Sequence, residues 1–189
     1  MSNKSIFLAS GSPRRSQLLS QLGYQFTQVL PDIEEIQNIG ESAEAYVQRL
    51  AKEKAMAAYR QVRKDGLYLG ADTLISYQDD VFEKPKNKLD HHSMLMLLSD
   101  NTHQVMTSVA VTNGKETCSI LVVTDVDFKK LTSQEIASYW ETQEPLDKAG
   151  GYAIQGIGGN FVRSIRGSYS SVVGLPLVET KQLLDSFVS

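Results

Sequence analysis

The chain is poor in the residues that make disulfides and zinc sites, and it has no long apolar run. Its single cysteine, Cys118, excludes an intramolecular disulfide, and its 3 histidines lack the spacing of a zinc site. Because no apolar stretch is long enough to cross a bilayer, we expect no membrane partner. The apolar stretch near the N-terminus spans about five residues, which is too short for the core of a signal peptide. These features favour a cytoplasmic protein.

An excess of basic charge is also missing. The formal net charge is −3 at pH 7, and the aromatic residues do not cluster into a platform for stacking bases, so we expect no nucleic-acid partner. The sequence has no Gly-x-Ser-x-Gly motif, which excludes the nucleophile elbow of the α/β-hydrolases. The remaining signals point to a small anionic ligand.

Helices and strands are expected to alternate along the chain, which predicts an α/β fold with a mixed sheet and flanking helices. The expected helices cover residues 13–22, 42–64, 88–99, 132–142 and 176–187. The expected strands cover residues 5–9, 24–30, 67–77, 81–83, 103–112, 116–128 and 152–165. The pair Asn113-Gly114 predicts a tight hairpin turn. With 189 residues, the length suits a single domain over 1–189.

The first expected strand runs into a small-residue turn that opens a helix. Ser12 is a good N-cap, and Pro13 suits the first helical position. The free N–H groups of such a helix start suit an anion. Arg14 and Arg15 follow in the first helical turn, where cations oppose the helix dipole. A phosphate-rich ligand would resolve that conflict.

Asp72 breaks the pattern of an otherwise apolar strand. Aspartate is disfavoured in strands and costly inside a sheet unless it is paired. One interpretation is a surface carboxylate at a strand end or at a bulge, which Gly70 would support. The alternative is a metal ligand or a general base.

Two lysines also stand in unusual places. Lys54 falls within the apolar stripe of the helix expected over 42–64, where it either covers the core with its stem or contacts phosphate at a pocket rim. Lys84 precedes Pro85 at a strand end, a position that is usually solvated. Each lysine alone leaves both interpretations open.

Two further segments have unusual compositions. Residues 147–159 are rich in glycine, which lets a backbone approach a ligand closely, although loop or bulge glycines explain them equally well. A Rossmann site is excluded here because no strand–turn–helix context follows. The adjacent acids Glu34 and Glu35 are either solvated, or one of them joins Asp72 at a divalent cation.

These residues combine into one chemistry. The four cations Arg14, Arg15, Lys54 and Lys84 can gather phosphate oxygens. Asp72 and Glu35 can hold a hard divalent ion that bridges phosphates and activates water. The combination suits hydrolysis at phosphorus, but the spacing alone chooses neither a nucleotide nor a bond.

An ordered set of short motifs spans almost the whole chain and resembles the Maf-like nucleoside triphosphate pyrophosphatases. The motifs are Leu8–Arg15, Leu69–Thr73, Glu83–Pro85, Asp147–Gly150, Gln155-Gly156, Gly167–Tyr169 and Val173–Pro176. The resemblance implies an inosine-triphosphatase-like fold with two lobes around a central cleft, and usually a homodimer. It also implies cleavage of a nucleoside triphosphate to the monophosphate and pyrophosphate with Mg²⁺ or Mn²⁺.

The resemblance assigns roles by motif. Asp72 would accept the proton of the attacking water and contact the metal, which Glu35 would help to hold. Substrate would be bound by seven residues, of which the four cations grip phosphates: Ser10, Arg14, Arg15, Lys54, Thr73, Lys84 and Gln155.

Three positions indicate the branch of the family. Arg14, Thr73 and Gln155 resemble the branch acting on dTTP and UTP, and modified pyrimidine nucleotides would suit the same house-cleaning role. The branch acting on 7-methyl-GTP tends to show Trp, Gln and Glu there. A neutral amide at Gln155 can both donate to and accept from an uncharged uracil or thymine. The alternatives are a 7-methyl-GTP pyrophosphatase, or a non-catalytic nucleotide-binding regulator of septum formation and cell division.

Overall fold

The computed structural model describes residues 4–187, which build one seven-stranded sheet. The strand order is β2-β1-β3-β5-β6-β7, with β4 paired to β3. The strands are β1 Ile6–Ala9, β2 Phe26–Val29, β3 Leu67–Tyr77, β4 Asp80–Phe82, β5 Thr102–Thr112, β6 Thr117–Phe128 and β7 Val162–Arg166. Strand β1 is parallel to β2 and β3, and the other pairs are antiparallel. The predicted mixed sheet is therefore confirmed, as is the β5–β6 hairpin.

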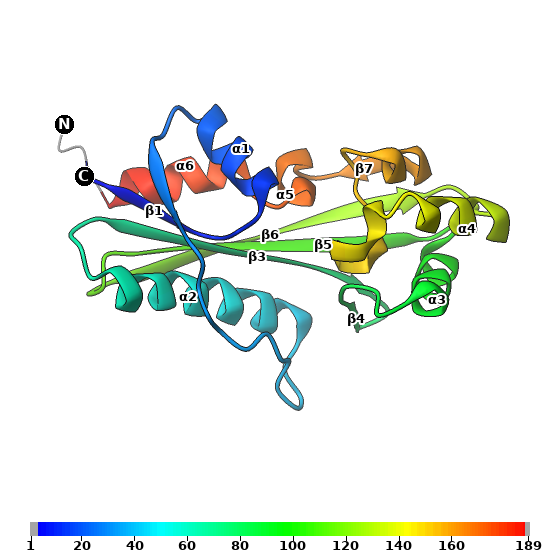
Figure 1. The fold of residues 1–189 in the computed structure, drawn as a ribbon, viewed down its shortest axis with the longest axis horizontal. Coiled ribbons are helices and arrows are strands. Elements are labelled where there is room, and N and C mark those ends of the chain that lie inside the picture. Colours follow the sequence, from blue (N-terminus) through cyan, green and yellow to red (C-terminus); the bar gives the residue numbers. More distant parts are fainter. Residues whose placement is uncertain (1–3, 188–189) are drawn as a thin grey trace.

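Helices cover both faces of the sheet (Figure 1). They are α1 Pro13–Gln21, α2 Ala43–Val62, α3 Lys88–Leu98, α4 Ser133–Glu141, α5 Tyr169–Val173 and α6 Leu177–Ser186. Helix α2 follows one face, while α1 and α6 lie on the other. Leucines of α1 and α6 pack with β1, β3 and β5 into one apolar core. Among the described residues, no helix is both long enough and apolar enough to cross a bilayer.

Gly70 lets helix α2 lie very close to β3. A Cβ atom at this position would stand 2.3 Å from the carbonyl oxygen of Ala51 and 2.5 Å from the backbone nitrogen of Ala55. The register continues through Gly70, which pairs with Ala110 of β5. The suggested bulge is therefore wrong, because the missing side chain serves helix–sheet contact instead. This close approach brings the buried face of α2 next to Asp72.

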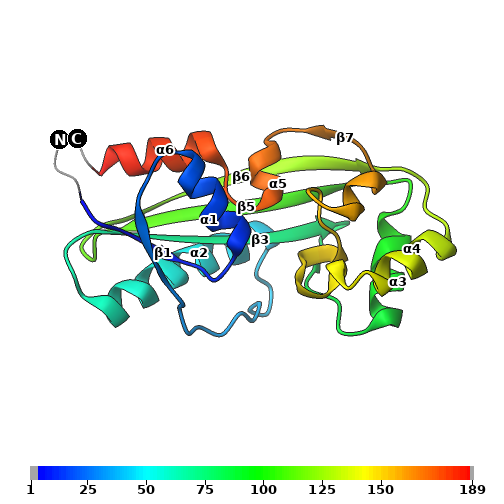
Figure 2. The same ribbon diagram turned by 45° about the horizontal axis from the view of Figure 1, so that its top comes forward.

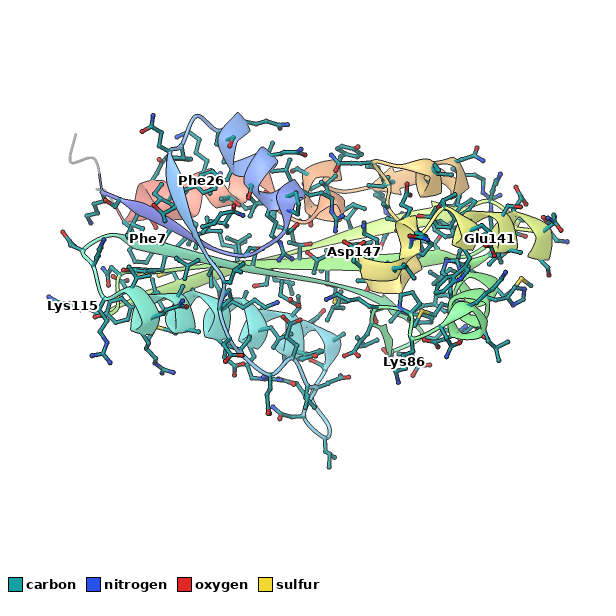
Figure 3. The ribbon with its side chains drawn as sticks, in the orientation of Figure 1. Phe7, Phe26, Lys86, Lys115, Glu141 and Asp147 are labelled. Carbon is teal, nitrogen blue, oxygen red and sulfur yellow. The ribbon has the colours of Figure 1, made fainter. Side chains whose placement is uncertain are left out.

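A second lobe lies at the end of the long strands away from the termini (Figure 2). Helices α3 and α4 pack there on β3, β5 and β6 around a second apolar core. This lobe also holds three short 3-10 helices: η1 Glu144–Asp147, η2 Ala149–Gly151 and η3 Ile157–Phe161. Asp147 lies on the side of this lobe that faces the middle of the molecule (Figure 3).

The strand expected over 152–165 is correct only at its end. Strand β7 covers Val162–Arg166, whereas residues 157–161 form η3 and residues 149–151 form η2. Within the expected strand, residues 154–156 form a turn and a bend, and Gly158 and Gly159 belong to η3, so extended backbone begins only at Val162. The short helix α5 was not expected, because its five residues carry too little periodicity to show in the sequence.

Candidate active site

A cavity of about 430 Å³ opens between the two lobes, and all nine predicted site residues line it. Its walls come from the turn before α1, the middle of β3, the segment after β4 and the segment 147–155. The nine residues are Ser10, Arg14, Arg15, Glu35, Lys54, Asp72, Thr73, Lys84 and Gln155. Positions as far apart as 10 and 155 are thus brought together by the parallel pairing of β1 with β3 and the return of the chain after α4.

Asp72 and Lys54 form a buried ion pair at the base of this cavity. Nζ of Lys54 lies 2.6 Å from Oδ1 of Asp72, and the side chains are only 8% and 10% exposed. The same Nζ lies 2.8 Å from Oε1 of Glu35. Asp72 is therefore neither a strand-end nor a surface residue, and Lys54 joins two carboxylates from separate segments. Glu34, in contrast, faces a second hollow beside α2.

The pKa of Glu35 is set by two opposing effects. Burial is the largest single effect and raises the pKa. The hydrogen bond and charge of Lys54, together with the charges of Lys84 and Arg15, lower the pKa by more than burial raises it. The net result is a pKa below the ordinary value. Glu35 is thus an anion at neutral pH, and its side chain is 47% exposed.

The two arginines of α1 have different surroundings. Arg15 donates from Nε to the carbonyl of Gly174 at 2.9 Å, from Nη2 to Oγ1 of Thr73 at 3.1 Å, and from Nη1 to Oγ of Ser10 at 3.4 Å. Burial lowers its pKa, an effect opposed by the charge of Asp72. Arg14 has no hydrogen bond or ion pair among the described residues. Arg15 therefore ties α1 to β3 and the end of α5, while the guanidinium of Arg14 is available to a ligand.

The turn before α1 has the predicted helix cap. Oγ of Ser12 accepts a hydrogen bond from the backbone N–H of Arg15, and Pro13 is the first helical residue. The backbone N–H of Ser12 donates to Oγ of Ser10 at 3.1 Å. Ser10 to Arg15 form one wall of the cavity, so a ligand there faces the positive end of the helix.

Positive charge exceeds negative charge around the cavity. Five cationic and three acidic side chains line it, and two of these eight, Lys148 and Asp147, had not been predicted. Lys148 is 13% exposed and forms an ion pair with Asp147. Both lie in the glycine-rich segment 147–159, and the motif Asp147–Gly150 was the feature of the sequence that could have identified them. The excess of positive charge suits a polyphosphate whose own charge is partly neutralised by a cation.

The end of the cavity beside the second apolar core is itself apolar. It is lined by Ile75, Val105, Tyr152, Ile154 and Val172, which belong to that core or pack against it, and Gln155 follows Ile154 in the chain. The hydroxyl of Tyr152 is 2.8 Å from Nε2 of His103, a fully buried side chain. Burial raises the pKa of Tyr152 and lowers the pKa of His103 to about 4, so both groups are neutral at pH 7. This end suits an uncharged ring.

Tyr139 and Glu144 hold the segment that carries Gln155. The Tyr139 hydroxyl accepts from the N–H of Ala153 at 3.1 Å and donates to Oε1 of Glu144 at 2.7 Å. The Glu144 carboxylate also accepts from the N–H groups of Ile157 and Gly158, each at 3.0 Å. Sequence reasoning missed this pair, because neither residue breaks a local rule.

The donors near Asp72 fit a divalent cation that is shared with a substrate. Carboxylate oxygens of Asp72 and Glu35 are hard ligands of the kind that Mg²⁺ and Mn²⁺ prefer. Within residues 4–187 there is no group of three or more acidic, histidine or cysteine side chains that could hold a metal. Phosphate oxygens and water would therefore have to complete the shell, as is usual for Mg²⁺ with nucleotides.

The fold and this cavity define an α/β protein with a cationic cleft around a buried carboxylate. The chain belongs to the Maf-like protein family, whose model matches residues 5–187. It is 55% identical to a dTTP/UTP pyrophosphatase of Salmonella typhimurium strain LT2, over 96% of this chain and 92% of that one. It is 53% identical to a dTTP/UTP pyrophosphatase of Vibrio parahaemolyticus, over 97% of each chain.

A solved structure shares the fold at low sequence identity. A HAM1 protein from Coxiella burnetii superposes with a TM-score of 0.52 and 15% identity, over 97% of this chain and 99% of that one. This likeness concerns the fold alone. The predictions of the family and of the α/β class are confirmed, whereas the roles of the nine residues stay predictions.

Proposed function

We propose that this protein hydrolyses dTTP and UTP to the monophosphate and pyrophosphate. The observation that carries the proposal is the buried Lys54–Asp72 pair at the base of a cavity lined by five cationic side chains. Relatives that are 53% and 55% identical over nearly the whole chain, and that are called dTTP/UTP pyrophosphatases, support this choice of substrate. Modified pyrimidine nucleotides would fit the same cavity.

The triphosphate would lie along the cationic wall. Arg14, Lys84 and the N-terminal turn of α1 would hold its outer phosphates, because these groups are charged or polar and face the cavity. Arg15 and Lys54 are fixed by protein partners and would shape the inner part of the site. The apolar end with Tyr152 and Gln155 would take the base.

Asp72 would orient a water and take its proton. The water would attack the α-phosphorus, and the bond between that phosphorus and the oxygen shared with the β-phosphate would break to release pyrophosphate. Lys54 holds Asp72 in one orientation through the 2.6 Å contact. Removal of this base should lower the rate by roughly 100-fold or more.

Asp72 and Glu35 would hold a divalent cation, Mg²⁺ or Mn²⁺, together with the phosphates. Such a cation withdraws charge from the phosphoryl group and neutralises the leaving pyrophosphate. Lys54 contacts one oxygen of each carboxylate. It would therefore compete with the cation for these oxygens, or share the two carboxylates with it.

A substrate panel tests the proposal. The protein is incubated with UTP, dTTP, CTP, ATP, GTP and 7-methyl-GTP, with Mg²⁺, with Mn²⁺ and with EDTA, and the products are separated. We expect UMP or dTMP with pyrophosphate, and no turnover in EDTA. Release of orthophosphate would contradict the bond assigned here. A preference for 7-methyl-GTP would favour the alternative enzyme, and binding without turnover would favour a nucleotide-binding regulator of cell division.

Asp72→Asn tests the role of the carboxylate, with Asp80→Asn as its control. Asp80 is exposed at the start of β4, on the strand that pairs with β3. We expect Asp72→Asn to lower turnover by roughly 100-fold or more while Asp80→Asn keeps it. Equal activity of the two variants would refute the assignment.

The homodimer and the cytoplasmic location stay predictions, and light scattering of the purified protein tests the first of them.

A further inference from the structure

The hydroxyl of Thr73 belongs to a chain of hydrogen bonds that ends on a backbone carbonyl. Nη2 of Arg15 donates to Oγ1 of Thr73 at 3.1 Å, and this oxygen lies 3.0 Å from Oγ1 of Thr107. Oγ1 of Thr107 in turn donates to the carbonyl of Ser171 at 2.8 Å. Thr73 and Thr107 are direct partners across β3 and β5, so the sheet itself fixes the contact between their hydroxyls.

The groups at the two ends of this series of hydrogen bonds determine which hydroxyl donates in each one. A carbonyl oxygen only accepts, so the single proton of the Thr107 hydroxyl points to Ser171. Thr107 can then only accept from Thr73, which must donate to it. A guanidinium only donates, so Arg15 uses one lone pair of Thr73. Thr73 therefore has no proton left for a ligand, and one lone pair remains.

Thr73 lines the cavity, whereas Thr107 is fully buried behind it. A ligand atom that hydrogen-bonds to Thr73 must be a donor, because the free position on this hydroxyl can only accept. The oxygens of an ionised triphosphate cannot meet this requirement. Among the pyrimidines, uracil and thymine carry a donor at N3, and cytosine carries an acceptor at the same place.

We propose that Thr107 is a positioning residue that fixes the Thr73 hydroxyl as an acceptor for the N3–H group of uracil or thymine. Cytidine nucleotides are rejected, because two acceptors would face each other without a proton between them. Gln155 cannot supply this discrimination alone, since an amide can turn over and offer either group. The inference rests on the proposed function and adds the rule by which the site separates UTP from CTP.

Thr107→Val tests the role of Thr107, because valine keeps the shape of threonine and removes the hydroxyl. The Thr73 hydroxyl is then free to rotate and donate. We expect the ratio of kcat/KM for UTP to that for CTP to fall about 10-fold or more, mainly through KM, with kcat for UTP nearly unchanged. Thr107→Ser keeps the hydroxyl and should restore the ratio.

Thr180→Val is the matched control. Thr180 is fully buried in α6, and its Oγ1 has no hydrogen-bond partner in the described part of the chain. This variant makes the same chemical change in the core and should keep the wild-type ratio. The carbonyl of Ser171 still accepts from the N–H of Gly174 at 2.9 Å when Thr107 is replaced, which limits the structural cost.

Thr73→Val keeps the proposal testable if Thr107→Val does not fold. We expect it to raise KM for UTP and to leave KM for CTP nearly unchanged. A wild-type ratio in folded Thr107→Val, or in Thr73→Val, would overturn the proposal. An equal rise of KM for both nucleotides would also overturn it, because Thr73 would then face the sugar or phosphates. Turnover of UTP by the wild-type protein is measured in the same experiment. Its absence would contradict the proposed function, whereas an unchanged UTP/CTP ratio in the variants would contradict only the role of Thr107.

Discussion

The ammonium group of Lys54 lies 2.6 Å from Oδ1 of Asp72, and both side chains are almost excluded from water. Lys54 belongs to α2 and Asp72 to the middle of β3, which Gly70 brings into close contact. A buried ion pair contributes little net stability compared with apolar side chains of the same shape, but loss of one partner is costly because it leaves the other charge alone. The stability of the fold and the charge of the site are therefore coupled.

Replacement of Lys54 by methionine should destabilise the fold. The uncompensated carboxylate of Asp72 should cost about 3–5 kcal/mol of unfolding free energy at pH 7. Urea unfolding followed by circular dichroism measures the change. Lys52→Met is the control, because Lys52 is exposed on the same helix. A loss of stability as small as that of the control would mean that solvent reaches the pair freely.

His103 should make stability fall in mild acid. Burial lowers its pKa from 6.5 in the unfolded chain to about 4 in the folded protein. Between these values only the unfolded chain takes up the proton, so this contribution is complete above pH 6.5 and is lost as the pH falls to 4. The total change is about 3 kcal/mol.

His103→Phe isolates that contribution, since an aromatic ring preserves the packing against Phe128 and Tyr152. Urea unfolding is measured from pH 7 to pH 4 for wild type, His103→Phe and the control His92→Gln. We expect the wild type and the control to lose more stability than His103→Phe over this range. Parallel curves for all three proteins would show that His103 is not the group that titrates.

Glu144→Gln should weaken substrate binding indirectly, through the segment that Glu144 holds. The carboxylate accepts hydrogen bonds from Tyr139, Ile157 and Gly158, and these fix the segment that carries Gln155. The loss of charge-assisted bonds should raise KM for UTP about 10-fold, with a smaller effect on kcat. Steady-state kinetics measure the split. Glu141→Gln, at an exposed ion pair with Lys88, should leave KM unchanged. An unaltered KM in folded Glu144→Gln would remove Glu144 from the site.

Gly70→Ala should destabilise the protein severely. The added methyl would lie 2.3 Å from the backbone oxygen of Ala51 and 2.5 Å from the backbone nitrogen of Ala55, so no side-chain movement can relieve the clash. Helix α2 would have to move from β3, at a cost of at least 1–3 kcal/mol, estimated roughly from overpacked cores. Gly40→Ala is the comparison, because a Cβ atom there meets nothing within 4 Å, although φ is +76°. Equal effects of the two changes on thermal unfolding would contradict the close-contact role of Gly70.

Local signals located most of the helices and strands correctly. The caps at Ser12, Ser42 and Thr132 work as expected, because a cap depends on residues only three apart. The prediction for 152–165 was wrong over most of its length, because its β-branched residues favour a strand while Gly156, Gly158 and Gly159 lie in a bend and in η3, which only the fold selects. The nine site residues were identified from breaks in local patterns and from the family resemblance, and the structure brings all nine to one cavity.

The sequence by itself determined the α/β class, the helix starts, the hairpin at Asn113-Gly114 and the set of charged residues that could bind a phosphate. These depend on periodicity, turn chemistry and residue type, which are local. Only the tertiary structure decided that Lys54 bridges Asp72 and Glu35, that Glu144 holds the segment of Gln155, and that Thr107 directs the proton of Thr73. Such contacts join residues 13 to 34 positions apart, and the packing of α2 on β3 and the pairing of β3 with β5 set the distances at Lys54 and at Thr73.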